Sequence, residues 1–259
     1  MSTTSRHVEL RGPSDAPAIV LLPSLGTQAA LWDLVATVLE ERWRLVLIEH
    51  PGHRPGAGPT PVAASVEAYG REVLEVLDAL GIERAHVVGV SIGGAIALAL
   101  ARDHPERIRR LGVVGAPRRF GSAEAWHERA AAVRANGTAS LVDGLLERWV
   151  PTGWSDANPS ERDQVADWVR ACDDEAYARH CEALAKFLFA PDRTVETPTL
   201  LVTGRDDPVA PPAAVLDLAA SFAAATVVVL GRSRHLPCLS EPRALATLLD
   251  DHLSGRLDD

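Results

Sequence analysis

The pentapeptide at residues 89–93 reads Gly-Val-Ser-Ile-Gly and holds one serine, Ser91, between two glycines. A β-branched run precedes it, and a nearly uncharged helical stretch follows it. A strand-to-helix turn of this kind brings the serine backbone close to its neighbours, so small flanking residues are required. The hydroxyl then lies at the carboxyl end of a strand, beside a helix N-terminus that favours developing negative charge. The pattern predicts that Ser91 is a nucleophile rather than part of a chance glycine-rich turn.

A nucleophilic serine requires a base, and the base requires an acid that orients it. Asp207 and His235 each follow a later strand-like run, in the chain order serine, acid, histidine. Asp206 is an alternative acid, but adjacent side chains after a strand point in different directions. Because Asp207 is the third residue after a glycine and directly precedes a proline, we predict a Ser91–His235–Asp207 triad. Asp206 is expected to hold the turn by bonding nearby N–H groups.

The oxyanion formed by nucleophilic attack needs two N–H donors, one of them from the residue after the nucleophile. Ile92 occupies that position. The second donor is expected in the loop at residues 22–27, where Leu25 supplies it by position and Gly26 lets the backbone turn. A plain turn is the alternative interpretation of this loop.

The elements that must position these residues alternate along the chain. Short aliphatic runs alternate with segments of helical periodicity, which is typical of an α/β fold with a mostly parallel sheet flanked by helices. The expected strands are residues 18–22, 44–48, 86–90, 111–114, 199–203 and 226–230. The expected helices are residues 66–80, 92–102 and 242–253, with one more beginning near Ala29.

The segment from residue 117 to residue 191 breaks this alternation. Helical patterns dominate it, strand-like runs are missing, and four of the six tryptophans lie in it. We predict a core made of residues 1–117 and 194–259. Residues 118–193 are expected to form a helical cap over the carboxyl edge of the sheet.

Composition limits the remaining function classes. The 259 residues are 47% hydrophobic and carry a formal net charge of −9, which disfavours nucleic-acid and anionic-membrane partners. Apolar runs are too short to span a bilayer, and three scattered cysteines without a CxxC pair predict neither a disulfide framework nor a metal knuckle. We expect a cytoplasmic protein with a small-molecule substrate and with no metal or other cofactor. Nothing in the sequence predicts an oligomeric state.

These residues together resemble the α/β-hydrolase superfamily over nearly the whole chain. Within it, several stretches are similar to 3-oxoadipate enol-lactonases. They are the entry loop SLGT…LWD at residues 24–33, residues 77–86 and 104–108, and the cap stretches 128–137, 146–149 and 177–184. The resemblance implies hydrolysis of a small lactone or enol ester whose carboxylate is held near the cap.

Three residues of these cap stretches are the predicted substrate-binding residues: Arg134, Arg148 and Trp149. An arginine fork matches a carboxylate in two bonds, and an adjacent indole can cover the apolar part of a small ring.

The chain also departs from the lactonase pattern. Residues 50–56 read His-Pro-Gly-His-Arg-Pro-Gly where lactonases usually carry an RGHGxS run, so the loop at residues 49–61 beside the oxyanion hole is remodelled. His235 is followed by Leu-Pro-Cys instead of Leu-Ser-Asn. The short N-terminus leaves little room for the first strand pair of the family.

Three functions fit this sequence. The first is a serine hydrolase that cleaves a small lactone, enol-lactone or carboxylic ester through an acyl-enzyme. The alternative is a C–C bond hydrolase or another cofactor-free enzyme on the same fold, because fold does not fix chemistry. The third is a ligand-binding protein without catalysis, which would gain nothing from keeping a nucleophile, a base and an acid together.

Overall fold

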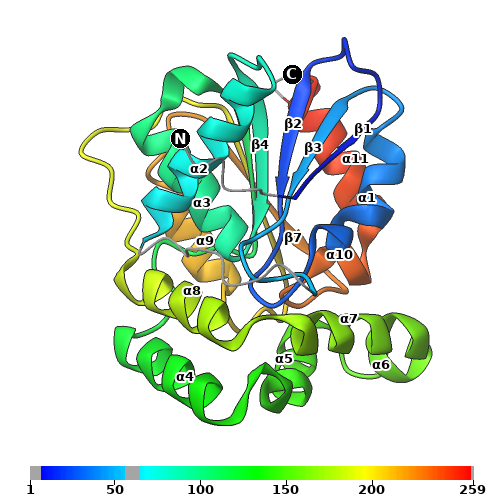
Figure 1. Cartoon of the computed structure of the whole chain (residues 1–259). Coiled ribbons are helices and arrows are strands. Elements are labelled where there is room, and N and C mark those ends of the chain that lie inside the picture. Colours follow the sequence, from blue (N-terminus) through cyan, green and yellow to red (C-terminus); the bar gives the residue numbers. More distant parts are fainter. Residues whose placement is uncertain (1–6, 56–64, 258–259) are drawn as a thin grey trace.

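The central feature of the molecule is a seven-stranded sheet, seen in a computed structural model that describes residues 7–55 and 65–257 (Figure 1). The strands lie in the order β1-β3-β2-β4-β5-β6-β7. β1 runs antiparallel to β3, and the other neighbours are parallel. The strands are β1 (Val8–Arg11), β2 (Ala18–Leu22), β3 (Arg44–Ile48), β4 (Ala85–Val90), β5 (Ile108–Val114), β6 (Thr199–Gly204) and β7 (Ala225–Leu230).

The six strands predicted from the sequence are confirmed, and β1 is an addition. Three of its four residues are partly buried and Leu10 is exposed, and its pairing depends on β3, more than thirty residues away along the chain. A short edge strand of this kind carries little local signal. In the described residues, β1 is the one strand that precedes the parallel series. The predicted remodelled loop at residues 49–61 lies within the described residues only as far as residue 55.

The parallel strands are apolar on both faces because helices cover both faces. In β2, Val20 and Leu22 pack toward α2, α3 and α9, while Ile19 and Leu21 pack toward α1 and α11. Figure 1 shows these two helical layers on either side of the sheet. The helices are η1 (Ala29–Trp32), α1 (Asp33–Leu39), α2 (Val66–Ala79), α3 (Ile92–Asp103), η2 (Pro105–Arg107), α9 (Pro212–Ala219), α10 (Pro237–Ser240) and α11 (Pro242–Leu253).

Between β5 and β6 the chain forms a group of helices that lies below one end of the sheet (Figure 1). These helices are α4 (Ala123–Asn136), η3 (Thr138–Leu141), α5 (Val142–Trp149), α6 (Trp154–Ala157), α7 (Pro159–Ala171) and α8 (Asp174–Lys186). The helical character expected of this segment is present. The domain boundaries at residues 118 and 193 stay a prediction.

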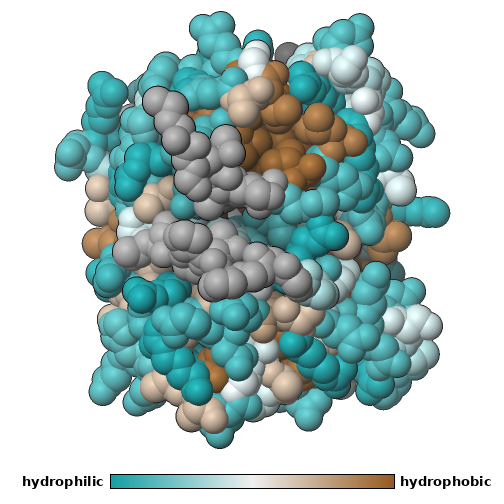
Figure 2. Space-filling view, viewed as in Figure 1, coloured by the Kyte–Doolittle hydropathy of each residue, from teal (hydrophilic) through white to brown (hydrophobic). Residues whose placement is uncertain are grey.

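In the view of Figure 2, most of the surface is hydrophilic, and a hydrophobic patch lies at the upper right, over the sheet-bearing part. Within residues 7–55 and 65–257, no helix combines the length and apolar character that a bilayer crossing needs.

Candidate active site

Ser91 occupies the sharp turn between β4 and α3. Its backbone has φ +57° and ψ −117°, and among the described residues it is the one non-glycine residue with a positive φ. Such a conformation costs on the order of 1–3 kcal/mol and persists only where its surroundings enforce it. Here the Ser91 N–H donates to the Val114 carbonyl of the neighbouring strand at 2.9 Å. The turn is therefore held from both sides, and Ser91 is only 6% exposed.

The glycines around Ser91 allow three backbone segments to meet. A Cβ at Gly89 would lie 2.1 Å from the Gly93 carbonyl oxygen, and a Cβ at Gly93 would lie 2.4 Å from the Leu22 carbonyl oxygen. Real Cβ atoms do not approach backbone oxygens so closely, so larger residues at either position would push the turn out of place. The spacing of small residues seen in the sequence thus has a steric cause.

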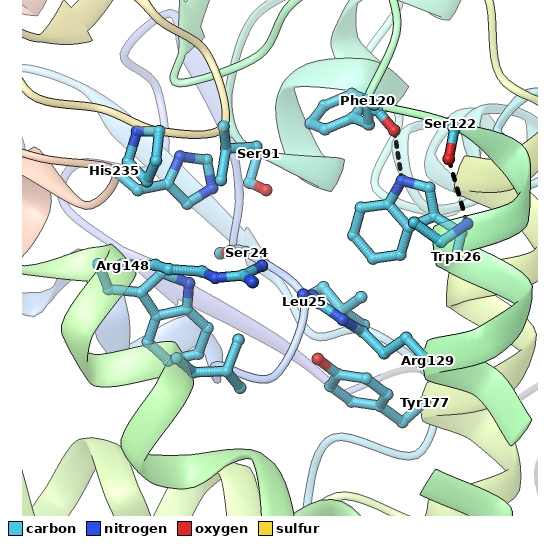
Figure 3. A pocket seen from close by; sticks show the side chains of 16 residues that line it. Ser24, Leu25, Ser91, Phe120, Ser122, Trp126, Arg129, Arg148, Tyr177 and His235 are labelled. Atoms are coloured by element: carbon cyan, nitrogen blue, oxygen red, sulfur yellow. Dashed lines mark hydrogen bonds between the residues drawn. The ribbon is translucent and has the colours of Figure 1, made fainter. Parts of the chain in front are cut away.

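Asp207 and His235 form a buried pair beside this turn. The Nδ1–H of His235 donates to both carboxylate oxygens of Asp207, at 3.0 and 3.1 Å. Both side chains are almost fully buried. With the proton fixed on Nδ1, the other ring nitrogen of the neutral imidazole is the basic one. His235 and Ser91 line the same cavity, as Figure 3 shows, so the predicted triad residues are brought together.

The carboxylate of Asp207 is also fixed by its own loop. Its Oδ1 accepts from the N–H groups of Val209 and Ala210, at 2.8 and 3.0 Å. Burial by itself raises the pKa of Asp207, but the charge and hydrogen bond of His235 and these two N–H groups together hold the pKa below its ordinary value. The group is therefore an anion that accepts the hydrogen bond of the His235 Nδ1–H.

The expectation that Asp206 bonds the N–H groups of the turn was wrong. Its side chain is exposed, and the carboxylate that bonds the N–H groups of the turn is that of Asp207. The side chains alternate after β6, so that Asp207 points inward and performs both tasks.

The two predicted oxyanion donors belong to peptides whose carbonyls are engaged on the opposite side. The Ser24 carbonyl accepts from the N–H and the hydroxyl of Thr27, at 3.1 and 2.9 Å. The N–H of that same peptide is that of Leu25. Likewise, the Ser91 carbonyl accepts from the Ala95 N–H at 2.9 Å, and its peptide carries the Ile92 N–H. Because N–H and C=O point in opposite directions across a trans peptide, both N–H groups are turned away from these bonds.

A cavity of about 220 Å³ opens in front of Ser91 (Figure 3). Aromatic and aliphatic side chains cover most of its wall, and two guanidinium groups, from Arg129 on α4 and Arg148 on α5, point toward each other across it. None of the sixteen described residues that line it is an Asp or a Glu. The aromatic and aliphatic residues are Leu25, Phe120, Ala125, Trp126, Leu145, Trp149, Tyr177, Pro208 and Val209.

Two of the three predicted substrate-binding residues, Arg148 and Trp149, line this cavity, and Arg134 does not. Arg134 lies at the surface, where its guanidinium bonds Glu175 and Glu182 of α8, each at 2.7 Å. The hydrogen bond from Arg134 is the main reason that the pKa of Glu175 falls to about 2. The structure therefore places Arg134 away from this cavity, where its side chain joins α4 to α8.

The arginine of α4 that faces the cavity is Arg129, which the sequence analysis did not select. It lies five positions before Arg134, and five positions correspond to roughly 140° around a helix. Its guanidinium lies over the ring of Trp126, 4.8 Å from the ring centre. The spacing of three between Trp126 and Arg129 was the available signal, because residues three apart on a helix are neighbours.

The loop that carries His235 is hydrogen-bonded to the helical wall of the cavity, which is formed by the helices between β5 and β6. The Leu236 N–H donates to the Trp149 carbonyl at 2.9 Å, and the guanidinium of Arg234 donates to the Glu147 carbonyl. Both acceptors lie at the C-terminal end of α5. Among the described residues, no group of three or more His, Cys, Asp or Glu side chains is arranged to hold a metal ion.

Comparison with known proteins gives relatives over most of the chain. The family model described as the alpha/beta hydrolase fold matches residues 17–242. 3-Oxoadipate enol-lactonase 1 of Acinetobacter baylyi is 33% identical over 203 residues, which is 78% of this chain and 76% of that protein. A protein of Stutzerimonas stutzeri, named provisionally as carbamate hydrolase RutD, is 30% identical over 96% of both chains. The crystal structure of an enol-lactonase from Burkholderia xenovorans superposes with a TM-score of 0.91, at 30% identity and over 96% of both chains.

Proposed function

We propose that this chain, which belongs to the α/β-hydrolase family and is a hydrolase, cleaves a small lactone, enol-lactone or carboxylic ester through an acyl-enzyme. The observation that carries the proposal is the strained Ser91 turn, which opens onto the same cavity as a buried His235–Asp207 pair. A strained turn reduces stability and persists only where its surroundings enforce it, so its presence beside a buried imidazole–carboxylate pair at one cavity favours a catalytic use.

The reaction follows from the placement of these groups. Ser91 Oγ attacks the substrate carbonyl while Nε2 of His235 takes its proton, and Asp207 stabilises the imidazolium. The N–H groups of Leu25 and Ile92 bind the oxyanion. The tetrahedral intermediate collapses, the C–O bond of the ring breaks, and the imidazolium protonates the leaving enolate or alkoxide oxygen. His235 then activates a water that attacks the acyl-enzyme, which releases the open-chain acid and restores Ser91.

We assign recognition of a free carboxylate on the substrate to Arg129 and Arg148. Two guanidinium groups that face each other repel, and none of the described lining residues supplies a carboxylate to separate them. An anionic substrate would supply the missing negative charge between the two guanidinium groups and would accept charge-assisted hydrogen bonds from both arginines. The names of the two enol-lactonase relatives, one of them for 3-oxoadipate, agree with an anionic lactone as the substrate.

A second candidate is a small carbamate. The relative from Stutzerimonas stutzeri matches this chain over almost its whole length. The same nucleophile, base and oxyanion donors suit the carbamate carbonyl, and the leaving group is then an amine or ammonia protonated by His235.

A substrate panel tests this proposal and separates the candidates. It contains anionic enol-lactones, their methyl esters, p-nitrophenyl esters, small carbamates, and a vinylogous 1,5-diketone for C–C hydrolysis. The highest kcat/KM is expected for an anionic lactone. A fluorophosphonate probe should label Ser91 of the wild-type protein and leave Ser91→Ala unlabelled. Absence of labelling in the wild type would contradict the serine mechanism, and a preference for the carbamate or the diketone would replace the lactone.

A further inference from the structure

Two consecutive buried residues after β3, Glu49 and His50, hold both ends of the loop that carries Leu25. Glu49 Oε2 accepts from the Ala29 N–H at 3.0 Å, at the far end of that loop. His50 Nε2 lies 2.8 Å from the Pro23 carbonyl oxygen, at its near end. Glu49 and His50 are 5% and 3% exposed. The loop from residue 23 to residue 29 is thus attached at both ends to one dipeptide.

The bond to Pro23 fixes the proton of His50. A carbonyl oxygen only accepts hydrogen bonds, so Nε2 carries the hydrogen. Proline has no N–H, and its carbonyl lies in a crowded place: a Cβ at Gly93 would come within 2.7 Å of this oxygen. The Pro23 carbonyl therefore lies between His50 and the turn that follows Ser91. Its orientation sets the plane of the peptide directly before the one that carries the Leu25 N–H.

The imidazole of His50 is itself held in place by packing. The ring centres of His53 and His180 each lie 5.5 Å from that of His50, so an element of the helical wall, α8, supports it from behind. An aliphatic side chain would fill such a buried position without the cost of desolvating a polar ring. Within the loop that departs from the lactonase pattern, a polar residue here needs a reason, and the bond to Pro23 supplies one.

We propose that Glu49 and His50 are positioning residues that fix the oxyanion loop, and that the His50 bond to the Pro23 carbonyl aims the Leu25 N–H at the reacting carbonyl oxygen. This inference rests on the proposed function, because it assumes that Leu25 is an oxyanion donor. Removal of one oxyanion donor lowers kcat by about 10²–10³-fold. Misalignment of a donor that stays in place should cost less, about 10–100-fold in kcat, with little change in KM.

Three variants test the role of the bond. In His50→Gln, the amide nitrogen reaches the position of Nε2 and can still donate to Pro23. His50→Leu has a similar volume and no donor. His53→Leu is the matched control: leucine keeps a buried side chain of similar volume against His50, and the imidazole that it removes bonds the Pro51 carbonyl through Nδ1 and not Pro23. Burial lowers the pKa of His53 to about 4, so this control removes no charge at neutral pH.

The measurements are kcat and KM for p-nitrophenyl acetate and the rate of fluorophosphonate labelling. We expect His50→Leu to lose about 10–100-fold in kcat and in labelling rate, while His50→Gln and His53→Leu stay within about threefold of the wild type. Should His50→Leu fail to fold, His50→Asn replaces it, because its shorter amide stops short of Pro23. Equal losses in His50→Leu and His53→Leu, or no loss in His50→Leu, would overturn the proposal. A wild-type protein without labelling would instead overturn the proposed serine mechanism.

Discussion

The two walls of the cavity are built in different ways. At the end of the sheet, Ser91, Asp207 and His235 are buried, and backbone groups or one another hold them in place. On the helical wall, Arg129 is half-exposed and Arg148 is exposed, and their long side chains reach the cavity from helix surfaces. Positions set by the backbone are difficult to change, whereas side chains on a helix are readily replaced. This contrast explains how one fold can keep one reaction and vary its substrate.

The largest effect is expected at the sheet end, from Ser91→Ala. The variant removes one oxygen from a turn whose shape is set by its glycines, so the fold should remain. Loss of a triad nucleophile lowers kcat on the order of 10⁴–10⁶-fold. Turnover of the best substrate of the panel measures it, with circular dichroism as the check on folding. A variant that keeps a tenth of the activity would contradict a nucleophilic role for Ser91, because this loss would be no larger than the one expected from the arginine variants.

Asp207→Asn should follow, with a loss of about 10⁴-fold in kcat, because an amide favours the wrong tautomer of His235. Asp206→Asn is its matched control: the neighbouring carboxylate is exposed, and kcat should change by less than about threefold. Steady-state kinetics of both variants decides between them. A larger loss in the Asp206 variant would reverse the assignment of the acid.

Glu49→Gln tests whether the buried carboxyl of Glu49 makes the free energy of unfolding depend on pH. Burial raises the pKa of Glu49 to about 7, although the N–H groups of Ala29 and His50 oppose it. The folded protein therefore keeps this proton between about pH 4.5 and 7, where the unfolded chain loses it. As a result, the free energy of unfolding falls by up to about 3 kcal/mol as pH rises through that range.

Glutamine cannot ionise, so the variant should lack this fall. Urea unfolding at pH 5 and pH 8 measures the difference between variant and wild type, which should favour the variant more at pH 8. The same difference at both pH values would contradict a raised pKa at Glu49.

On the helical wall, Arg129→Met and Arg148→Met should raise KM for an anionic lactone by about 10–100-fold, the range expected when a hydrogen bond to a charged group is lost. KM for the corresponding methyl ester should stay nearly constant, and kcat should change little. Equal effects on acid and ester would remove the argument for a carboxylate, and a neutral substrate would then be the better hypothesis.

Arg134→Met should have the smallest effect. Its ion pairs with Glu175 and Glu182 lie at the surface, where such pairs contribute about 0–1 kcal/mol to stability. KM should be unchanged for both acid and ester, which makes this variant the control for the two cavity arginines. A selective rise in KM for the acid would return Arg134 to the site.

The same division explains what could be predicted from the sequence. Ser91, Asp207 and His235 each follow a strand, and the carboxyl ends of neighbouring parallel strands meet at one edge, so local patterns placed them together. The strand pattern could not select the cavity arginine of α4, because Arg129 and Arg134 lie on one helix and its packing against α8 determines which of them faces the cavity. The edge strand β1 was missed for a related reason: its pairing with β3 is a long-range contact.

The hydrogen bond from the Leu236 N–H to the Trp149 carbonyl has a consequence for the passage of substrate and product. Any outward movement of α5 would pull on the loop that carries His235 and separate His235 from Ser91. Movement of α4, which is attached through Trp126 to Phe120 and through Arg134 to α8, leaves that loop in place. A gate formed by α4 would therefore leave Ser91, His235 and Asp207 in their arrangement, whereas a gate formed by α5 would disturb that arrangement each time it opened.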